Sequence, residues 1–132
     1  MKLFLGTDIC EIDRIQSLYD KYGEKFLRKT FTDAEISYCT SKPHHTAARL
    51  AVRFATKEAV SKGLGVGMNK LGWSRGINWK DVELVRSLNG SVTLQLYGKA
   101  RELEGKFGIT KWEVSVSHSK RDAISTVVGY RE

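Results

Sequence analysis

The chain has 132 residues, of which 41% are hydrophobic and 28% charged, and this composition fits one globular domain spanning residues 1–132. Its formal net charge of +7 predicts an acidic partner: nucleic acid, an anionic membrane surface, a phosphorylated small molecule or an acidic protein. With no signal peptide, no bilayer-spanning apolar run and only Cys10 and Cys39, a secreted disulfide scaffold is excluded, and we expect a cytoplasmic protein that does not associate with membranes.

The first residues predict a buried strand and then a helix. Residues 3–9 form a short apolar run, and we expect Asp8 at or near its end because aspartate is poorly suited to the middle of a strand. Residues 10–23 have apolar side chains at helical spacing and end at Gly23, a plausible helix stop. Arg14 lies off the apolar stripe, so it should point outward.

Two more helices are predicted before the middle of the chain. The sequence TDAE at residues 32–35 is a capping-box pattern, which begins a short helix ending near Cys39. The longest helical segment follows, with Pro43 at its first turn and Gly63 and Gly65 at its end.

The next residues predict a loop and a hairpin. Residues 66–80 look like a loop that carries Trp73 and Trp79. The segment 81–96 alternates apolar and polar residues on both sides of Asn89-Gly90, a favoured hairpin turn.

The last third predicts a helix and two strands. Residues 97–108 have the helical pattern, and residues 111–130 read as strands around a turn at Ser119–Asp122, with His118 at the end of the first strand. The chain is therefore expected to be α+β, with an antiparallel sheet wrapped around one long helix.

The stretch RFATKEAVSKGLGVG, residues 53–67, is a candidate binding segment. Arg49, Arg53 and Lys57 form a cationic row at four-residue spacing, and Glu58 and Lys62 are also four apart. One interpretation is a solvated helix face with a common surface ion pair. The other is that these cations bind phosphates, since an anionic ligand would offset the repulsion within the row.

Asp8 also has two interpretations. It could cap the following helix, with Glu11 three residues later completing a capping box. Alternatively, Asp8 and Glu58 could be carboxylate ligands of one Mg²⁺, which binds one or two carboxylates together with substrate phosphates and water. His118, inside SVSHSK, is a weaker candidate for contact with a charged ligand.

Three segments together resemble a known family. GTDICEIDRI near the N-terminus, RFATKEAVSKGLGVG in the middle and VSVSHSKRDAISTVV near the C-terminus resemble the holo-acyl-carrier-protein synthases, the small class of 4′-phosphopantetheinyl transferases. The match runs almost end to end and in the family's order. Each motif alone is weak, whereas the combination is specific.

The resemblance implies an activity and a set of site residues. The family moves 4′-phosphopantetheine from coenzyme A to a serine of apo acyl carrier protein, releases adenosine 3′,5′-bisphosphate and supports fatty acid biosynthesis. The residues that match its Mg²⁺ ligands are Asp8 and Glu58, and Lys62 matches its phosphate-contacting lysine. The implied catalytic residues are thus Asp8, Glu58 and Lys62, and either Glu58 or a water on the metal would take the serine proton.

The resemblance also implies contacts with both substrates. The positions that match the coenzyme A-binding region are Arg53, Phe54, Lys57, Lys62, Gly63, Gly65, Gly67, His118 and Ser119, the last two supplied by a neighbouring subunit. Arg14 matches a contact with the acidic carrier protein, and Lys21 and Arg28 could steer the same encounter. The family is trimeric with active sites between subunits, so we expect a homotrimer of single-length subunits.

Two departures and two alternatives accompany this resemblance. The hairpin turn reads LNGSV where the family often has Gly-Lys-Pro, and the 66–80 loop is longer than in many members. A nucleic-acid-binding module, suggested by the basic charge and the tryptophans, lacks alternating basic and aromatic residues or a recognised motif. An inactive carrier-binding scaffold would not require the intact set Asp8, Glu58 and Lys62.

Overall fold

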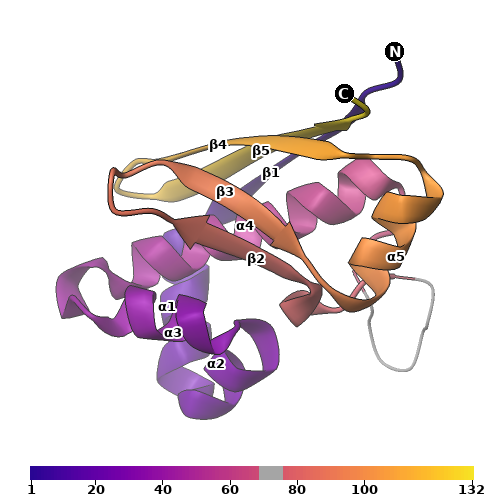
Figure 1. Ribbon diagram of the computed structural model, residues 1–132. Coiled ribbons are helices and arrows are strands. Elements are labelled where there is room, and N and C mark those ends of the chain that lie inside the picture. Colours follow the sequence, from indigo (N-terminus) through magenta and orange to yellow (C-terminus); the bar gives the residue numbers. More distant parts are fainter. Residues whose placement is uncertain (69–75) are drawn as a thin grey trace.

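A long helix, α4 (Thr46–Leu64), lies at the centre of an α+β fold in the computed structural model, which describes residues 1–68 and 76–132 (Figure 1). Antiparallel strands in the order β1-β5-β4 pack on one side of this helix, and the antiparallel hairpin β2-β3 packs on another. The strands are β1 (Phe4–Glu11), β2 (Val82–Arg86), β3 (Val92–Leu96), β4 (Lys111–His118) and β5 (Asp122–Tyr130). The expected α+β class and its antiparallel strands around a long helix are confirmed.

Shorter helices cover the two ends of α4. In Figure 1, α1, α2 and α3 gather near its N-terminal end, whereas α5 lies near its C-terminal end. These elements are α1 (Ile12–Tyr22), α2 (Glu24–Thr30), α3 (Asp33–Thr40) and α5 (Gly98–Lys106), with 3₁₀ turns η1 (Pro43–His45) and η2 (Trp79–Asp81). Among the described residues, no helix is long and apolar enough to cross a bilayer.

The backbones of β1 and α4 touch directly. A side-chain carbon added to Gly6 would lie 1.8 Å from the carbonyl oxygen of Ala59, so only glycine fits at this crossing. Gly63, one turn further along α4, lies against the backbone of the same strand. Because no side chain separates the two elements here, the position of β1 on the helix is fixed by backbone contact.

The interpretation of Asp8 as a helix cap is wrong. Strand β1 continues past Asp8 to Glu11, and Asp8 pairs with Ser125 of β5 inside the sheet. The N-cap residue of α1 is Glu11, and its side chain makes no capping hydrogen bond. Aspartate is tolerated inside this strand because its side chain has an ion-pair partner on α4.

Other boundaries differ from the sequence prediction in specific ways. Helix α2 was not predicted, and α4 continues through Gly63 and ends at Leu64, with Gly65 in the left-handed conformation as its C-cap. The capping box at residues 32–35 and the hairpin around Asn89-Gly90 are confirmed, the hairpin strands being joined by residues 87–91. In the expected 66–80 loop, Trp79 begins η2, whereas Trp73 lies outside the described residues.

Candidate active site

An ion pair joins β1 to the C-terminal end of α4. Alternation along β1 turns Asp8 toward the helix, on the same face as the buried Gly6 and Cys10. The Lys62 ammonium donates hydrogen bonds to Asp8 Oδ1 at 2.8 Å and to the Thr7 carbonyl at 3.2 Å. The hydrogen bond to Asp8 raises the pKa of Lys62 above its ordinary value, so the folded protein stabilises the charged ammonium.

Glu58 lies one helical turn before Lys62 and shares this neighbourhood. Its side chain is half-buried. The charges of Asp8 and Glu58 both act to raise the pKa of Lys62, and both also act in the same direction on the Cys10 thiol. The fold therefore brings these two carboxylates to one place from distant parts of the sequence, as the pairing hypothesis required.

The donor set at this place suits a hard divalent cation. Within residues 1–68 and 76–132, no group of three or more His, Cys, Asp and Glu side chains could hold a metal ion. Magnesium does not need such a cage, because it commonly binds one or two carboxylates and completes its shell with water and substrate phosphate. Asp8 and Glu58 thus fit Mg²⁺ better than they fit a fully protein-ligated metal.

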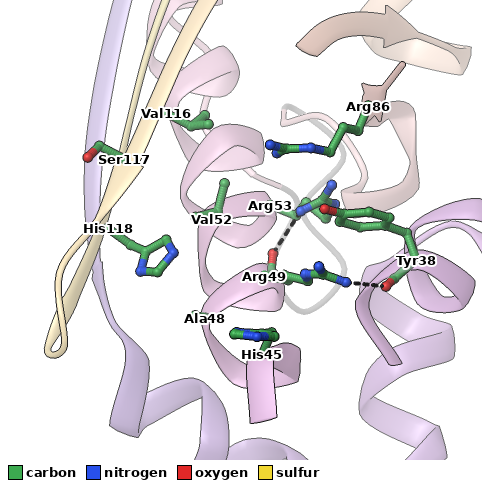
Figure 2. Close-up of a pocket in the computed structure, with 10 residues that line it drawn as sticks. All are labelled: Tyr38, His45, Ala48, Arg49, Val52, Arg53, Arg86, Val116, Ser117 and His118. Atoms are coloured by element: carbon green, nitrogen blue, oxygen red, sulfur yellow. Dashed lines mark hydrogen bonds between the residues drawn. The ribbon is translucent and has the colours of Figure 1, made fainter. Parts of the chain in front are cut away.

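A second site lies beside the N-terminal half of α4 and is rich in cations. This cationic pocket has a volume of about 450 Å³. Figure 2 shows arginine side chains and Tyr38 along one wall and His118 reaching from β4 on the other. It is lined by Tyr38, His45, Ala48, Arg49, Val52, Arg53, Arg86, Val116, Ser117 and His118. Its residues therefore come from α3, η1, α4, β2 and β4.

Arg53 is the most deeply placed cation of this pocket. Only 3% of its surface is exposed, and its guanidinium lies 4.6 Å from the ring centroid of Tyr38, with Arg49 at 4.2 Å from the same ring. One terminal nitrogen of Arg53 donates to the Arg49 carbonyl at 3.1 Å. Its buried Nε has no hydrogen-bond partner among the described residues. Because the arginines Arg49, Arg53 and Arg86 line this pocket, it favours an anionic ligand.

The structure corrects the expectation that Lys57 contacts coenzyme A. Lys57 is completely buried, and its ammonium lies 2.7 Å from the Glu35 carboxylate. Burial lowers the pKa of Lys57, and the neighbouring Glu35 charge opposes that change. An ammonium enclosed in this way cannot reach a ligand at the surface, so Lys57 is an internal ion-pair partner.

The glycines expected to bind coenzyme A fall into two groups. Gly63 belongs to α4 and faces the backbone of β1. Gly65 and Gly67 have positive φ angles of 75° and 71° and form the turn that follows the helix, within a few residues of Lys62. A side chain is strained at both turn positions, and a side-chain carbon added there would meet no atom of the described residues within 4 Å.

Three other residues expected to bind coenzyme A lie away from the Asp8–Lys62 pair. They are Phe54, His118 and Ser119. Phe54 is buried and stacks on Trp79, with ring centroids 4.6 Å apart. His118 lines the cationic pocket, whereas the Ser119 hydroxyl accepts hydrogen bonds from backbone N–H groups of the β4–β5 turn. Within one chain, His118 therefore lines the same pocket as Arg53, and Asp8 is not part of that pocket.

The residues expected to meet the carrier protein are exposed on α1 and α2. Arg14 and Lys21 are seven residues apart and share a face of α1, and Arg28 lies on α2, where it pairs with Glu24 at 3.5 Å. Arg14 also places its guanidinium 5.5 Å from the Phe54 ring centroid. Beside them is a pocket of about 440 Å³ lined by Leu18, Tyr22, Lys25, Phe26, Lys29, Thr30, Phe54 and Trp79.

Sequence reasoning placed Arg49 in a cationic row without assigning it to the coenzyme A site, and it did not single out Tyr38 or Arg86. Arg49 had a usable signal, because it precedes Arg53 by one helical turn. Tyr38 and Arg86 had none, since each reaches the pocket only through the packing of α3 and β2 against α4.

Comparison with known proteins identifies the family. The family model described as the 4′-phosphopantetheinyl transferase superfamily matches residues 4–127. The chain belongs to this superfamily. A holo-[acyl-carrier-protein] synthase of Gloeobacter violaceus is 42% identical over 123 residues, covering 93% of this chain and 89% of the relative. The resemblance inferred from the three motifs is thus confirmed.

Solved structures agree with this assignment. The synthase of Neisseria meningitidis superimposes with a TM-score of 0.83 at 25% identity, covering 98% of this chain and all of the other. That of Helicobacter pylori, solved in complex with coenzyme A, gives a TM-score of 0.79 at 30% identity and covers 96% of this chain and 99% of the other. These transferases therefore share the fold of this chain along nearly its whole length.

Proposed function

We propose that this chain is a holo-acyl-carrier-protein synthase, which transfers 4′-phosphopantetheine from coenzyme A to a serine hydroxyl of apo acyl carrier protein and releases adenosine 3′,5′-bisphosphate. The product supports fatty acid biosynthesis. The observation that carries the proposal is the Asp8–Lys62 ion pair with Glu58 beside it, at the crossing of β1 and α4. Family membership and curated relatives with this name support it independently.

Asp8 and Glu58 are our proposed ligands for Mg²⁺. When bound, the ion would neutralise charge on the diphosphate of coenzyme A and so favour attack on it. Lys62 has a half-exposed side chain and would contribute a second positive charge beside the same phosphates. Glu58 is our candidate for accepting the proton of the attacking serine hydroxyl.

The cationic pocket is our proposed site for the nucleotide end of coenzyme A. That end carries a phosphate monoester, and Arg49, Arg53 and His118 offer donors of matching charge. The placement of Arg49, Arg53 and Arg86 around one pocket supports this assignment, because their guanidinium groups match the charge of a phosphate. Gly65 and Gly67 would then approach the opposite, diphosphate end.

The active sites should lie between subunits of a homotrimer. Arg53 and Lys62 are nine residues apart on α4, which puts them on opposite sides of the helix. One coenzyme A molecule would therefore contact Lys62 of one subunit and Arg53 of another. The outer face of the β1-β5-β4 sheet supports a second copy as its partner, since Leu5, Ile9 and Ile124 are exposed there.

Mixing two inactive variants tests this arrangement. An Asp8→Ala protein and an Arg53→Ala protein, refolded together, should recover transfer activity because some interfaces combine two intact halves. Recovery no greater than for either variant alone would contradict sites shared between subunits.

The acidic carrier protein is proposed to dock on α1 and α2. Arg14, Lys21 and Arg28 are exposed there, and they border an apolar pocket next to Phe54. Charge complementarity would speed the encounter, and the apolar pocket would bind a side chain of the carrier. The cytoplasmic location inferred from the sequence stays a prediction.

Intact-mass spectrometry tests the function directly. An apo acyl carrier protein incubated with this protein, coenzyme A and Mg²⁺ should gain the mass of one phosphopantetheine, and EDTA should prevent the gain. A gain that persists in EDTA would refute the metal assignment alone. No gain with several carrier proteins, from a folded sample, would refute the transferase.

A further inference from the structure

One buried carboxylate joins α3, α4 and β2. Glu35 Oε1 accepts hydrogen bonds from the Lys57 ammonium at 2.7 Å and from the Thr32 N–H at 3.0 Å, and Oε2 accepts from the Leu84 N–H at 3.1 Å. Lys57 also donates to the Val82 carbonyl. Both side chains of the pair are 1% exposed. We refer to this pair and its backbone partners as the Glu35–Lys57 node.

The node lies directly behind the cationic pocket. On each element that it joins, a pocket residue lies on the same face, one helical turn or one strand alternation away. These pairs are Glu35 with Tyr38 on α3, Lys57 with Arg53 on α4, and Leu84 with Arg86 on β2. A smaller cavity of about 150 Å³ is lined by Glu35, Tyr38, Arg53 and Arg86 together with neighbouring residues of α3 and β2, so no dense packing separates the node from the pocket.

Two carboxylates line this region, Glu35 and Glu83, and Glu83 already accepts hydrogen bonds from the Thr32 and Tyr97 hydroxyls. Arg53 and Lys57 are one turn apart on α4, and Glu35 is buried beside Lys57. Arg53 has an Nε without a partner, and it lines the same small cavity as Glu35. If Lys57 were absent, the unpaired Glu35 carboxylate would attract the nearest cation, because a buried charge without a counter-ion is strongly unfavourable. Arg53 is the buried cation that lines the small cavity with Glu35, whereas Arg86, which also lines it, is exposed to water.

We propose that Lys57 is a positioning residue, which neutralises Glu35 and thereby keeps the Arg53 guanidinium available to a phosphate group in the cationic pocket. The inference rests on the proposed function, since it takes coenzyme A as the ligand of that pocket. It gives Lys57 a role in donor binding without contact between Lys57 and the donor. Asp8, Glu58 and Lys62 lie around the helix from the node, so the chemical step is unaffected.

Binding of adenosine 3′,5′-bisphosphate, measured by calorimetry, tests the inference. In Lys57→Met, Arg53 turns toward Glu35, and the bisphosphate binds about tenfold more weakly, the loss of one hydrogen bond to a charged group. In the double variant Glu35→Gln/Lys57→Met the attraction is removed, so affinity returns to within about threefold of wild type. For the transfer reaction, Lys57→Met raises KM for coenzyme A and leaves kcat within about twofold.

A purely structural role gives a different pattern. Lys57→Met with wild-type affinity for the bisphosphate, or a double variant that binds as weakly as the single one, overturns the inference. If Lys57→Met does not fold, Lys57→Gln and Glu35→Gln/Lys57→Gln replace the pair and must show the same loss and recovery. Wild-type protein that binds no bisphosphate overturns the proposed function, and this inference with it.

Discussion

The two lysines of the central helix lie in opposite environments. Lys62 is exposed at the C-terminal end of α4 and holds Asp8 of β1, whereas Lys57 is enclosed between α3 and β2 and holds Glu35. Each makes a close ion pair, at 2.8 Å and 2.7 Å respectively. The two ion pairs cannot be distinguished by their distances, but they differ in how deeply they are buried. A pair that water and ligands can reach is suited to chemistry, and a pair that they cannot reach is suited to holding elements together.

The largest expected effect is on the rate of transfer, after substitution of a carboxylate beside the exposed Lys62. Replacing Asp8 by Asn, or Glu58 by Gln, removes a proposed metal ligand, so the rate of transfer should fall by about 100-fold or more while the protein stays folded. Intact-mass time courses measure the rate, and circular dichroism checks the fold. Asp13→Asn, an exposed carboxylate on α1, is the matched control. Transfer at the wild-type rate in either variant would remove that residue from the site.

Substituting each lysine by methionine tests the comparison itself. Lys57→Met removes the buried counter-ion of Glu35, and Arg53 must leave the Tyr38 ring to replace it, so the free energy of unfolding should fall by about 3 kcal/mol. Lys62→Met should change it by less than about 1 kcal/mol, because that pair is exposed to solvent. Urea unfolding measures both. Equal losses of stability would mean that burial does not distinguish the pairs.

The same two lysine variants should show the reverse order in their loss of transfer rate. At saturating coenzyme A, Lys62→Met should lower the rate by about tenfold or more, because it removes a cation beside the phosphates. Lys57→Met should leave this rate nearly unchanged. A catalytic loss confined to Lys57→Met would contradict our assignment of both residues.

The contact between β1 and α4 allows a finer test. Gly6→Ala forces a methyl group against the Ala59 carbonyl, so it should cost about 1–3 kcal/mol of stability and move Asp8 away from Lys62. Gly105→Ala is the matched control, since a methyl group added there meets no atom within 4 Å among the described residues and favours the helix. A neutral Gly6→Ala would show that the crossing is looser than described.

The smallest expected effect concerns the pH dependence of stability and the buried thiol of Cys39 on α3. Burial raises the pKa of Cys39 from 9.0 to about 11, so folded protein keeps a proton that unfolded protein releases. The stability from this thiol is complete below pH 9 and is lost as the pH rises toward 11. Between about pH 8 and about pH 10, wild type should lose about 1 kcal/mol more than Cys39→Ala. Parallel pH profiles would indicate that the thiol is accessible to water.

Much of this fold could be predicted because local patterns agree with it. The capping box at residues 32–35, the alternation on both sides of Asn89-Gly90 and the glycine stop at Gly65 each act over a few neighbouring residues. Helix α2 was missed because only Gly23 separates it from α1, and no capping pattern marks its start at Glu24.

The candidate site was only partly predictable. Asp8 and Glu58 could be paired by their chemistry and by family resemblance, but their proximity depends on β1 crossing α4. Lys57 and Lys62 have the same residue type on the same helix, and only the packing of α3 and β2 over one of them buries it. Tyr38 and Arg86 reach the cationic pocket through that same packing, which no local pattern reports.

The glycine crossing at Gly6 also indicates which parts of this protein can be altered by directed evolution. The spacing of Asp8 and Lys62 is set by two backbones in contact, and few substitutions can adjust it without breaking it. The cationic pocket is assembled from side chains of separate elements, so its shape can change in small steps. A mutant library aimed at α3 and β2 should therefore yield altered donor preference, whereas one aimed at β1 should yield mainly inactive proteins.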